Sequence, residues 1–284
     1  MNIGEILLKS YGILKNVGIE SYLLDSQLLL GRVLNVDKLF IMTNRGFDLN
    51  HQEENEFSRL IQLRKSKMPI KYILGECEFM GMKLIVKPGV LIPRPDTEIL
   101  VEEVIKHINE KAYTQVCDVC SGSGAIGIAI AEFIKGAKVT LYDISYDAIA
   151  VAKLNIERFD LESRVNEQHS DLLQSAIQQN KKFQVVVSNP PYIREAVIPT
   201  LMEDVKNYEP YIALSGGEDG LKFYRRITQE SLQVLEKGGL LAFEIGYDQR
   251  EEVQDILLKS GFKSIVCIKD LSGNDRVVKG ILMD

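Results

Sequence analysis

The stretch Ser188-Asn189-Pro190-Pro191-Tyr192-Ile193 follows the apolar run Val185–Val187, which predicts a buried strand. Asn189 and Pro190 each precede a proline, so both are expected to be extended, and neither proline can donate an N–H to a sheet. The strand end therefore presents the Asn189 amide, the Pro190 carbonyl and the aromatic face of Tyr192. Two acceptors beside a flat apolar surface suit the binding of a planar NH2 group.

Around this stretch, from residue 115 onward, strand and helix patterns alternate. Strands are predicted at 115–119, 138–142, 164–169, 183–188, 239–245, 262–268 and 276–283, and helices at 125–135, 146–158, 221–236 and 248–259. Alternation of this kind predicts an α/β fold with a mostly parallel sheet covered on both faces. The last two strands have no helix between them, so we expect them to pair antiparallel. Ligands of such sheets bind at the carboxyl ends of the strands.

The first part of the chain has helical periodicity instead. Apolar spacing predicts helices over 3–17 and 22–34, and Asn50 with Glu53 forms a capping-box pattern that opens a helix to about Lys67. Pro69 is expected to end this helical region. Three or four helices should form a small bundle, which we interpret as a substrate-recognition domain, with plain structural support as the alternative.

Beyond the bundle, the pattern predicts a short linker and then the main domain. Residues 76–86 read as two short strands joined at Met80-Gly81, and Asp96 or Thr97 should cap a helix that runs to about Lys111. The proline-rich segment 88–95 is not expected to form regular structure. We therefore predict a helical domain at 1–75, a β-hairpin linker at 76–92 and an α/β domain at 93–284.

Composition narrows the function classes. The net charge of −6 over 284 residues argues against nucleic acid as the main partner. No apolar run is long enough to span a membrane, four cysteines give no disulfide framework, and a cytoplasmic location is expected.

A basic run comprises Arg59, Arg64, Lys65, Lys67 and Lys71. A solvated helix end is the favoured interpretation of this run, with docking of an acidic partner as the alternative.

A glycine-containing turn follows the first predicted strand of the sheet. Its residues are Cys120, Ser121, Gly122, Ser123 and Gly124, after which a helix begins. Glycines let a backbone approach a ligand closely and present N–H groups at the helix start. Asp143, at the end of the second strand, can accept hydrogen bonds from both hydroxyls of a ribose, and Asp171 with Leu172 can bracket an adenine.

Two other chemistries fit parts of this region. Gly122, Gly124 and Gly127 match the dinucleotide-binding spacing, but a nicotinamide enzyme leaves Asn189 to Tyr192 without a role. Cys117 and Cys120 form a Cys-x-x-Cys pair. No second pair follows at ligand spacing, so we expect no metal site.

Several segments together resemble one family, the release factor glutamine methyltransferases (HemK/PrmC). They are Pro93-Arg94-Pro95-Asp96-Thr97-Glu98, the glycine turn, Asp143-Ile144-Ser145, Asn189-Pro190-Pro191-Tyr192-Ile193, Tyr208-Glu209-Pro210, Gly216-Gly217-Glu218-Asp219-Gly220-Leu221, Glu244-Ile245-Gly246 and Asp275-Arg276-Val277-Val278. The resemblance covers nearly the whole chain. It implies a seven-stranded, Rossmann-like methyltransferase domain behind a small helical bundle.

By the same resemblance, the methyl donor is S-adenosylmethionine. The acceptor is the side-chain amide nitrogen of the glutamine in the Gly-Gly-Gln loop of class I peptide chain release factors. The implied cofactor contacts are Cys120, Ser121, Gly122, Ser123, Gly124, Asp143, Leu172 and Asn189, and the implied substrate contacts are Asn189, Pro190, Pro191 and Tyr192. Catalysis is assigned to Asn189, Pro190 and Tyr192, and a monomer is expected. The family commonly has glycine where this chain has Cys120, so a side chain there could crowd the cofactor.

Two alternative functions are weighed against this one. A nucleic-acid adenine N6 methyltransferase shares the Asn-Pro-Pro-Tyr motif, but it should carry a basic cleft and a target-recognition domain. A non-catalytic binding protein on the same fold should have lost Asp143 or Asn189, and both are present.

Overall fold

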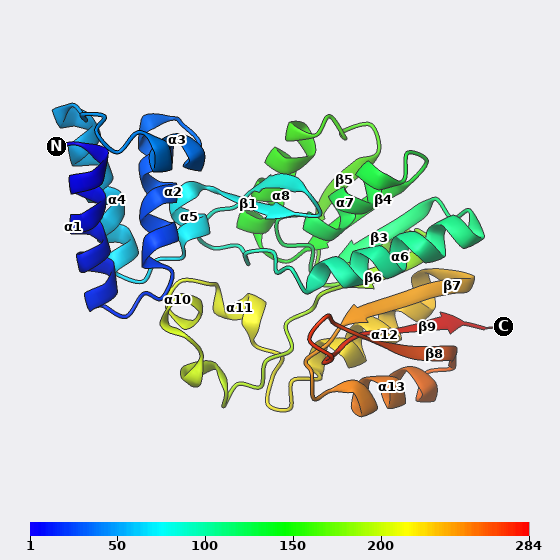
Figure 1. Ribbon diagram of the computed structural model, residues 1–284. Coiled ribbons are helices and arrows are strands. Elements are labelled where there is room, and N and C mark those ends of the chain that lie inside the picture. The colour runs from blue at the N-terminus through cyan, green and yellow to red at the C-terminus, as the bar shows by residue number, and fades with distance from the viewer. Residues whose placement is uncertain (284) are drawn as a thin grey trace. The chain divides into compact units, whose positions relative to one another are not determined.

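Two units make up the computed structural model, which describes residues 1–283 (Figure 1). A helical unit comprises Met1–Glu76 together with Met202–Tyr208. An α/β unit comprises Cys77–Leu201 together with residues 209–283. No helix among the described residues is both long and apolar enough to cross a membrane.

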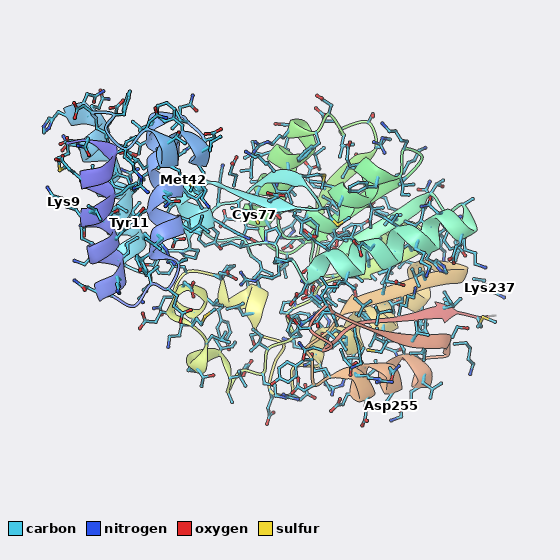
Figure 2. The ribbon with its side chains drawn as sticks, viewed as in Figure 1. Lys9, Tyr11, Met42, Cys77, Lys237 and Asp255 are labelled. Atoms are coloured by element: carbon cyan, nitrogen blue, oxygen red, sulfur yellow. The ribbon has the colours of Figure 1, made fainter. Side chains whose placement is uncertain are left out.

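The helical unit buries one continuous apolar core. Its elements are α1 (Ile3–Asn16), α2 (Tyr22–Leu34), α3 (Lys38–Thr43), α4 (His51–Lys65), α5 (Ile70–Leu74) and, from much later in the chain, α10 (Glu203–Lys206). Leu7, Leu29 and Phe57 are among the core side chains. Tyr11, labelled in Figure 2, meets the ring of Tyr22 edge-on at 6.0 Å beside this core. Capping boxes open both α1 and α4, and the one at α4 is the predicted Asn50–Glu53 pair.

Two expectations for this unit are wrong. Pro69 does not end the helical region, because α5 begins at the next residue with Pro69 at its N-cap, where a missing N–H leaves no bond unmade. Arg64 is not a solvated member of the basic run. It is buried, its Nε donates to Asp25 Oδ2 at 2.6 Å, and its Nη1 donates to the Met68 carbonyl at 3.1 Å.

The late segment Met202–Tyr208 is tied to the helical unit by Tyr208. Its hydroxyl donates to the Ser66 carbonyl and lies 3.0 Å from Ser66 Oγ. The loop that follows the Asn-Pro-Pro-Tyr stretch therefore leaves the α/β unit, joins the helical unit and returns.

The α/β unit is built on a seven-stranded sheet. Its strands are β3 (Gln115–Val119), β4 (Lys138–Asp143), β5 (Val165–His169), β6 (Phe183–Ser188), β7 (Leu235–Glu244), β8 (Phe262–Lys269) and β9 (Asp275–Leu282). The strand order is β5-β4-β3-β6-β7-β9-β8. Neighbours from β5 to β7 pair in parallel, whereas β9 runs antiparallel to both β7 and β8. The predicted α/β class and the C-terminal hairpin are confirmed.

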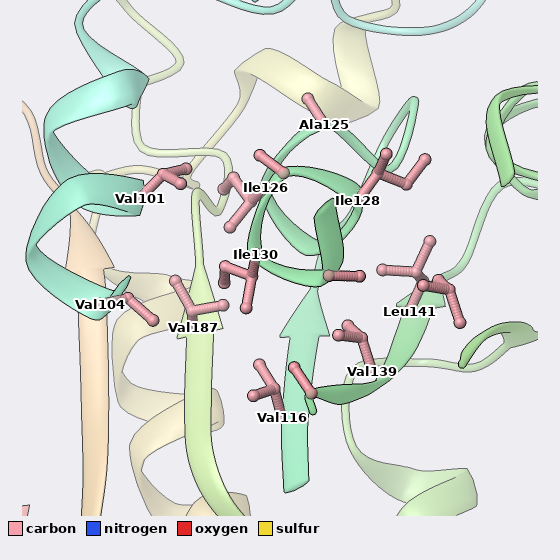
Figure 3. Close-up of a cluster of buried hydrophobic side chains, with 14 of the residues drawn as sticks. Val101, Val104, Val116, Ala125, Ile126, Ile128, Ile130, Val139, Leu141 and Val187 are labelled. Atoms are coloured by element: carbon pink, nitrogen blue, oxygen red, sulfur yellow. The ribbon is translucent and has the colours of Figure 1, made fainter. Parts of the chain in front are cut away.

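Helices pack on both faces of this sheet. One face is packed against α6 (Thr97–Lys111), α7 (Ala125–Phe133) and α8 (Tyr146–Arg158), the other against α9 (Gln174–Gln178), α12 (Lys222–Val234) and α13 (Arg250–Lys259). Figure 3 shows the first core, where side chains of α6 and α7 meet those of β3, β4 and β6. The side chains of a strand alternate between faces, so Val116 joins this core and Cys117 joins the opposite one.

Shorter elements complete the unit. They are β1 (Glu76–Phe79), β2 (Met82–Ile85), the 3₁₀ turn η1 (Ile198–Thr200) and α11 (Tyr211–Leu214). The hairpin β1–β2 forms where it is predicted. Asn155 on α8 holds it, because its Oδ1 accepts from Ile85 N at 2.6 Å and its Nδ2 donates to the Ile85 carbonyl at 3.0 Å. The same Nδ2 reaches the Ser123 carbonyl at 2.9 Å, so the hairpin is linked to the glycine turn.

Element ends differ from prediction mainly at β7. This strand begins at Leu235, four residues before the predicted start at 239, and α12 ends at Val234 instead of 236. The register between β6 and β7 shifts between Phe183 and Val185, so the residues around Gly238 extend the strand through an irregularity. The short helices α3, α9, α10 and α11 are too brief for a helical period to predict.

Candidate active site

A cavity of about 320 Å³ lies where β3, β4, β5 and β6 end. Segments that follow these strands line it, namely residues 120–123, 143–145, 170–172, Asn189 and Pro191, and further lining comes from residues 89–97 and 210–226. Parallel strands bring their carboxyl ends to one edge, so the sheet gathers segments that are distant in sequence. The cavity thus lies at the carboxyl ends of the strands, where the strand pattern predicts that a ligand binds.

The glycine turn forms the floor next to α7. Cys120, Gly122 and Gly124 all have positive φ, at 60°, 56° and 81°. At Gly124 a Cβ would lie 2.9 Å from Ile128 Cδ1 and 3.0 Å from Leu141 Cδ1, so only glycine fits without a shift. Ser121 Oγ is buried and has no hydrogen-bond partner among the described residues. This unpaired hydroxyl is available to a ligand.

Asp143 fastens the turn to the end of β4. Its Oδ2 accepts from Gly122 N at 2.8 Å and its Oδ1 accepts from Ser145 N at 2.9 Å. Burial raises the pKa of Asp143, and the backbone N–H donors of Ser145 and Gly122 act against that rise. Each carboxylate oxygen keeps acceptor capacity, so Asp143 can also bind two hydroxyl groups of a ligand.

The cavity lining also includes apolar side chains and a charged pair. Leu172 and Ile144 line it, and Leu172 is held at φ 51°. Asp171 is paired through both carboxylate oxygens with Arg226, each contact measuring 3.0 Å. A flat apolar group with polar edges fits such a place, which is the chemistry expected for an adenine.

Two glycines pack closely against the backbone of the Asn189–Tyr192 loop. A Cβ on Gly216 would lie 2.7 Å from Tyr192 Cα, and one on Gly220 would lie 2.6 Å from the Tyr192 carbonyl oxygen. Gln249 Nε2 donates to that same carbonyl at 3.0 Å and to the Gly220 carbonyl at 3.2 Å. The motif is therefore held by backbone contacts that leave no space for larger residues.

The structure brings most of the predicted site residues to one cavity, but not all of them. Those that line it are Cys120, Ser121, Gly122, Ser123, Asp143, Leu172, Asn189 and Pro191. Gly124, Pro190 and Tyr192 are not among the lining residues. Gly124 is the N-cap of α7, and the Tyr192 hydroxyl donates to Glu244 Oε1 at 3.2 Å.

Many lining residues carry no role in the sequence prediction, among them Thr97, Ile144 and Arg226. Thr97 belongs to the Pro-Arg-Pro-Asp-Thr-Glu segment, so its presence in that segment was a signal. Arg226 lies four residues before Glu230 and contacts it at 3.1 Å, a spacing visible in the sequence. No group of three His, Cys, Asp or Glu side chains suited to a metal occurs in residues 1–283.

Comparison with known proteins decides the family. Residues 95–205 match the family model of the methyltransferase small domain, and residues 5–75 match that of the PrmC N-terminal domain. The release factor glutamine methyltransferase of Clostridium botulinum is 53% identical over 98% of this chain and 99% of its own length. That of Clostridium acetobutylicum is 52% identical over 99% of both chains. This chain belongs to the release factor glutamine methyltransferase family.

A more distant likeness concerns the fold alone. The N-terminal domain of human METTL16 superposes with a TM-score of 0.53 at 18% identity, covering 84% of this chain and 85% of that one. As a member of the release factor glutamine methyltransferase family, this chain is a methyltransferase, and its α/β unit contains most of the segment that matches the methyltransferase small domain.

Cys120 has a backbone conformation that is unusual for a residue with a side chain. Its φ of 60° lies in the left-handed region that favours glycine. Burial raises the pKa of the Cys120 thiol well above its usual value, with the Asp143 charge adding to the rise. The thiol is therefore protonated and a weak nucleophile at neutral pH, which argues against redox work by the Cys-x-x-Cys pair.

Beneath the glycine turn lies a buried acid, Asp118. Its Oδ2 accepts from Gly127 N at 2.9 Å, while its Oδ1 has no partner among residues 1–283. Burial raises the pKa of Asp118 to about 8, and the nearby Asp143 charge adds to the rise. The folded protein thus holds Asp118 protonated at pH values where the unfolded chain has it ionised.

This difference predicts a pH-dependent stability. Protonated Asp118 stabilises the folded state, and that stabilisation decreases as pH rises from the ordinary value near 4 towards about 8. Asp118→Asn keeps an acceptor for Gly127 N but does not titrate. The unfolding free energy of the wild type minus that of Asp118→Asn should fall by about 1.4 kcal/mol per pH unit between about pH 5 and 7. Urea titrations at several pH values measure it, and a constant difference would contradict the prediction.

Proposed function

We propose that this methyltransferase transfers a methyl group from S-adenosylmethionine to the side-chain amide nitrogen of the glutamine in the Gly-Gly-Gln loop of class I release factors. The observation that carries the proposal is the convergence on one cavity of the glycine turn, Asp143 and Asn189. The relatives that are named for this reaction match the chain over nearly its full length, which supports the same substrate.

The residues present fit the methyl donor. Unpaired Ser121 Oγ and the Asp143 carboxylate supply polar partners, and Leu172 with Ile144 supplies an apolar surface. Asp143 would bind the ribose hydroxyls, the residues 120–124 would lie against the cofactor, and Leu172 would contact its adenine. When bound, S-adenosylmethionine supplies an activated methyl group on a sulfonium.

The Asn189–Tyr192 loop would hold the glutamine amide. Asn189 Oδ1 and the Pro190 carbonyl would accept the two amide hydrogens, which favours positive charge on the nitrogen during transfer and orients its lone pair. Pro191 lines the cavity beside Asn189. An amide nitrogen is a weak nucleophile, so accurate placement carries much of the barrier reduction. The proton can leave to water after transfer.

Tyr192 contributes in a way that differs from the sequence hypothesis, which has its ring packing on the substrate amide. In this structure its hydroxyl contacts buried Glu244, and the residue is absent from the cavity lining. We propose that Tyr192 fixes the position of the loop through this hydrogen bond to Glu244. The helical unit would recognise the release factor, whereas a purely structural role is its alternative.

Methyl transfer to a purified class I release factor tests this function. Label from S-adenosylmethionine should enter the intact factor. It should not enter a factor whose Gly-Gly-Gln glutamine is replaced, nor double-stranded DNA. Label on DNA would favour the adenine N6 reaction instead, and the absence of label from every substrate would refute the proposed reaction.

A further inference from the structure

A buried network joins the start of α6 to the end of β7 beside the Asn-Pro-Pro-Tyr loop. Thr97 is 4% exposed and Glu244 is 1% exposed. The Thr97 hydroxyl donates to Glu244 Oε2 at 2.5 Å, and Asn189 Nδ2 donates to Thr97 Oγ1 at 3.2 Å. The Tyr192 hydroxyl donates to the other oxygen of Glu244 at 3.2 Å. One carboxylate therefore holds both ends of the loop.

Glu244 acts in this network as an acceptor on both oxygens. Burial raises the pKa of Glu244, while the Thr97 hydroxyl, the charge of Arg276 and the Tyr192 hydroxyl favour its ionised form. Arg276 is itself held by Asp270 at 3.0 Å. A carboxylate can only accept hydrogen bonds, so it sets the direction of every bond that reaches it.

The direction of these bonds determines which way the Asn189 amide faces. A threonine hydroxyl has a single proton, and here the proton is committed to Glu244. Towards Asn189, Thr97 Oγ1 can therefore only accept. If the amide were rotated by half a turn, its oxygen would face the lone pairs of Thr97 and the bond would be lost. The network thus favours Nδ2 towards Thr97 and Oδ1 away from it.

We propose that Thr97, oriented by Glu244, is a positioning residue that fixes the polarity of the Asn189 amide and so presents Oδ1 to the NH2 group of the substrate. This inference rests on the proposed function, because it assumes that Asn189 Oδ1 accepts from the acceptor amide. Thr97 acts through Asn189 and through none of the reacting atoms.

Three variants test the role of the hydroxyl in turnover. Thr97→Val keeps the shape and removes the hydroxyl, and kcat/KM for the release factor should fall about tenfold, the value of one orienting hydrogen bond. Thr97→Ser keeps the hydroxyl and should stay within about twofold of wild type. Thr228→Val is the matched control, because Thr228 is buried in α12 and its Oγ1 has no partner in the described chain. An equal loss in Thr97→Ser or in Thr228→Val would contradict the proposal.

A double-mutant cycle separates positioning from general structural support. In an Asn189→Ala background no amide remains to be oriented, so Thr97→Val should cause no further loss of turnover. An additional loss of about tenfold in that background would show that Thr97 acts elsewhere, and would overturn the proposal.

A second readout needs no release factor. The side-chain NH2 resonances of Asn189 can be assigned in ¹⁵N-labelled enzyme by their disappearance in Asn189→Ala. They should shift in Thr97→Val and stay in place in Thr97→Ser and Thr228→Val. Unchanged resonances in Thr97→Val would overturn the inference. If instead the wild type fails to methylate the factor while the resonances shift as expected, the proposed function fails and the network remains.

Discussion

Asn189→Ala is expected to reduce methyl transfer to the release factor by about 10²–10³-fold, the usual loss when one preorganised polar group at a reacting centre is removed. Asn189 lines the cavity at the end of β6, and its side chain is anchored at 3.2 Å to Thr97. The substitution removes an acceptor for the substrate amide. It leaves the glycine turn and Asp143 in place, so the dissociation constant for S-adenosylmethionine should change by less than about tenfold.

Two further variants serve as controls for Asn189→Ala. Asn166→Ala removes an asparagine side chain from an exposed position on β5, outside the cavity lining, and should leave turnover unchanged. Asn189→Asp keeps the shape but replaces the donor to Thr97 with a second acceptor, so it should lose nearly as much activity as the alanine variant. Single-turnover kinetics and calorimetric titration with S-adenosylmethionine measure the two effects. Turnover of Asn189→Ala near the wild-type rate would refute the role of Asn189.

Gly220→Ala is expected to lower turnover by about 100-fold, because a small displacement of positioning groups has effects of this size. Gly220 has φ 77°, and a Cβ would lie 2.6 Å from both the Tyr192 carbonyl oxygen and Gln249 Nε2. The methyl group should therefore break the hydrogen bond between Gln249 and Tyr192 and displace the Asn-Pro-Pro-Tyr loop. The left-handed backbone adds strain of about 1 kcal/mol or more.

Gly136→Ala is the matched control for this substitution. A Cβ on Gly136 would meet no atom within 4 Å, and the residue has no positive φ, so its substitution should change neither turnover nor melting temperature. Circular dichroism should show that Gly220→Ala remains folded. Full activity of Gly220→Ala would show that turnover does not depend on the loop position that the close packing of Gly220 maintains.

Much of the fold follows from local pattern. The apolar runs at 115–119 and 183–188 have the bounds of β3 and β6, and the periodic segments 22–34 and 146–158 have those of α2 and α8. Patterns of this strength predict the element bounds correctly because burial of one face and backbone propensity favour the same structure. The solvent exposure predicted for Arg64 is wrong for the opposite reason. The basic residues near it in sequence gave no sign of burial, and only the approach of Asp25 from α2 turns it into a buried ion pair.

The candidate site likewise has residues that the sequence predicted and residues that it did not. Asp143 and Asn189 could be proposed from sequence because each follows a recognisable strand, and parallel strands deliver their ends to one edge. Tyr192 could not be placed, since the direction of its hydroxyl depends on Glu244, which lies 52 residues later. Thr97 lies 147 residues before Glu244, and its hydrogen bond to that carboxylate has no local signal.

By itself, the sequence determined the α/β architecture, the helical region before it, the position of the Asn-Pro-Pro-Tyr loop after a buried strand and the strand ends that meet at the cavity. Local periodicity and motif spacing suffice for these features. Only the tertiary structure decided which polar groups are buried together, and hence that Thr97 and Glu244 orient Asn189 and that glycines clamp Tyr192. Hydrogen-bond direction and close backbone approach depend on atoms from distant segments, and a linear pattern does not encode their distances.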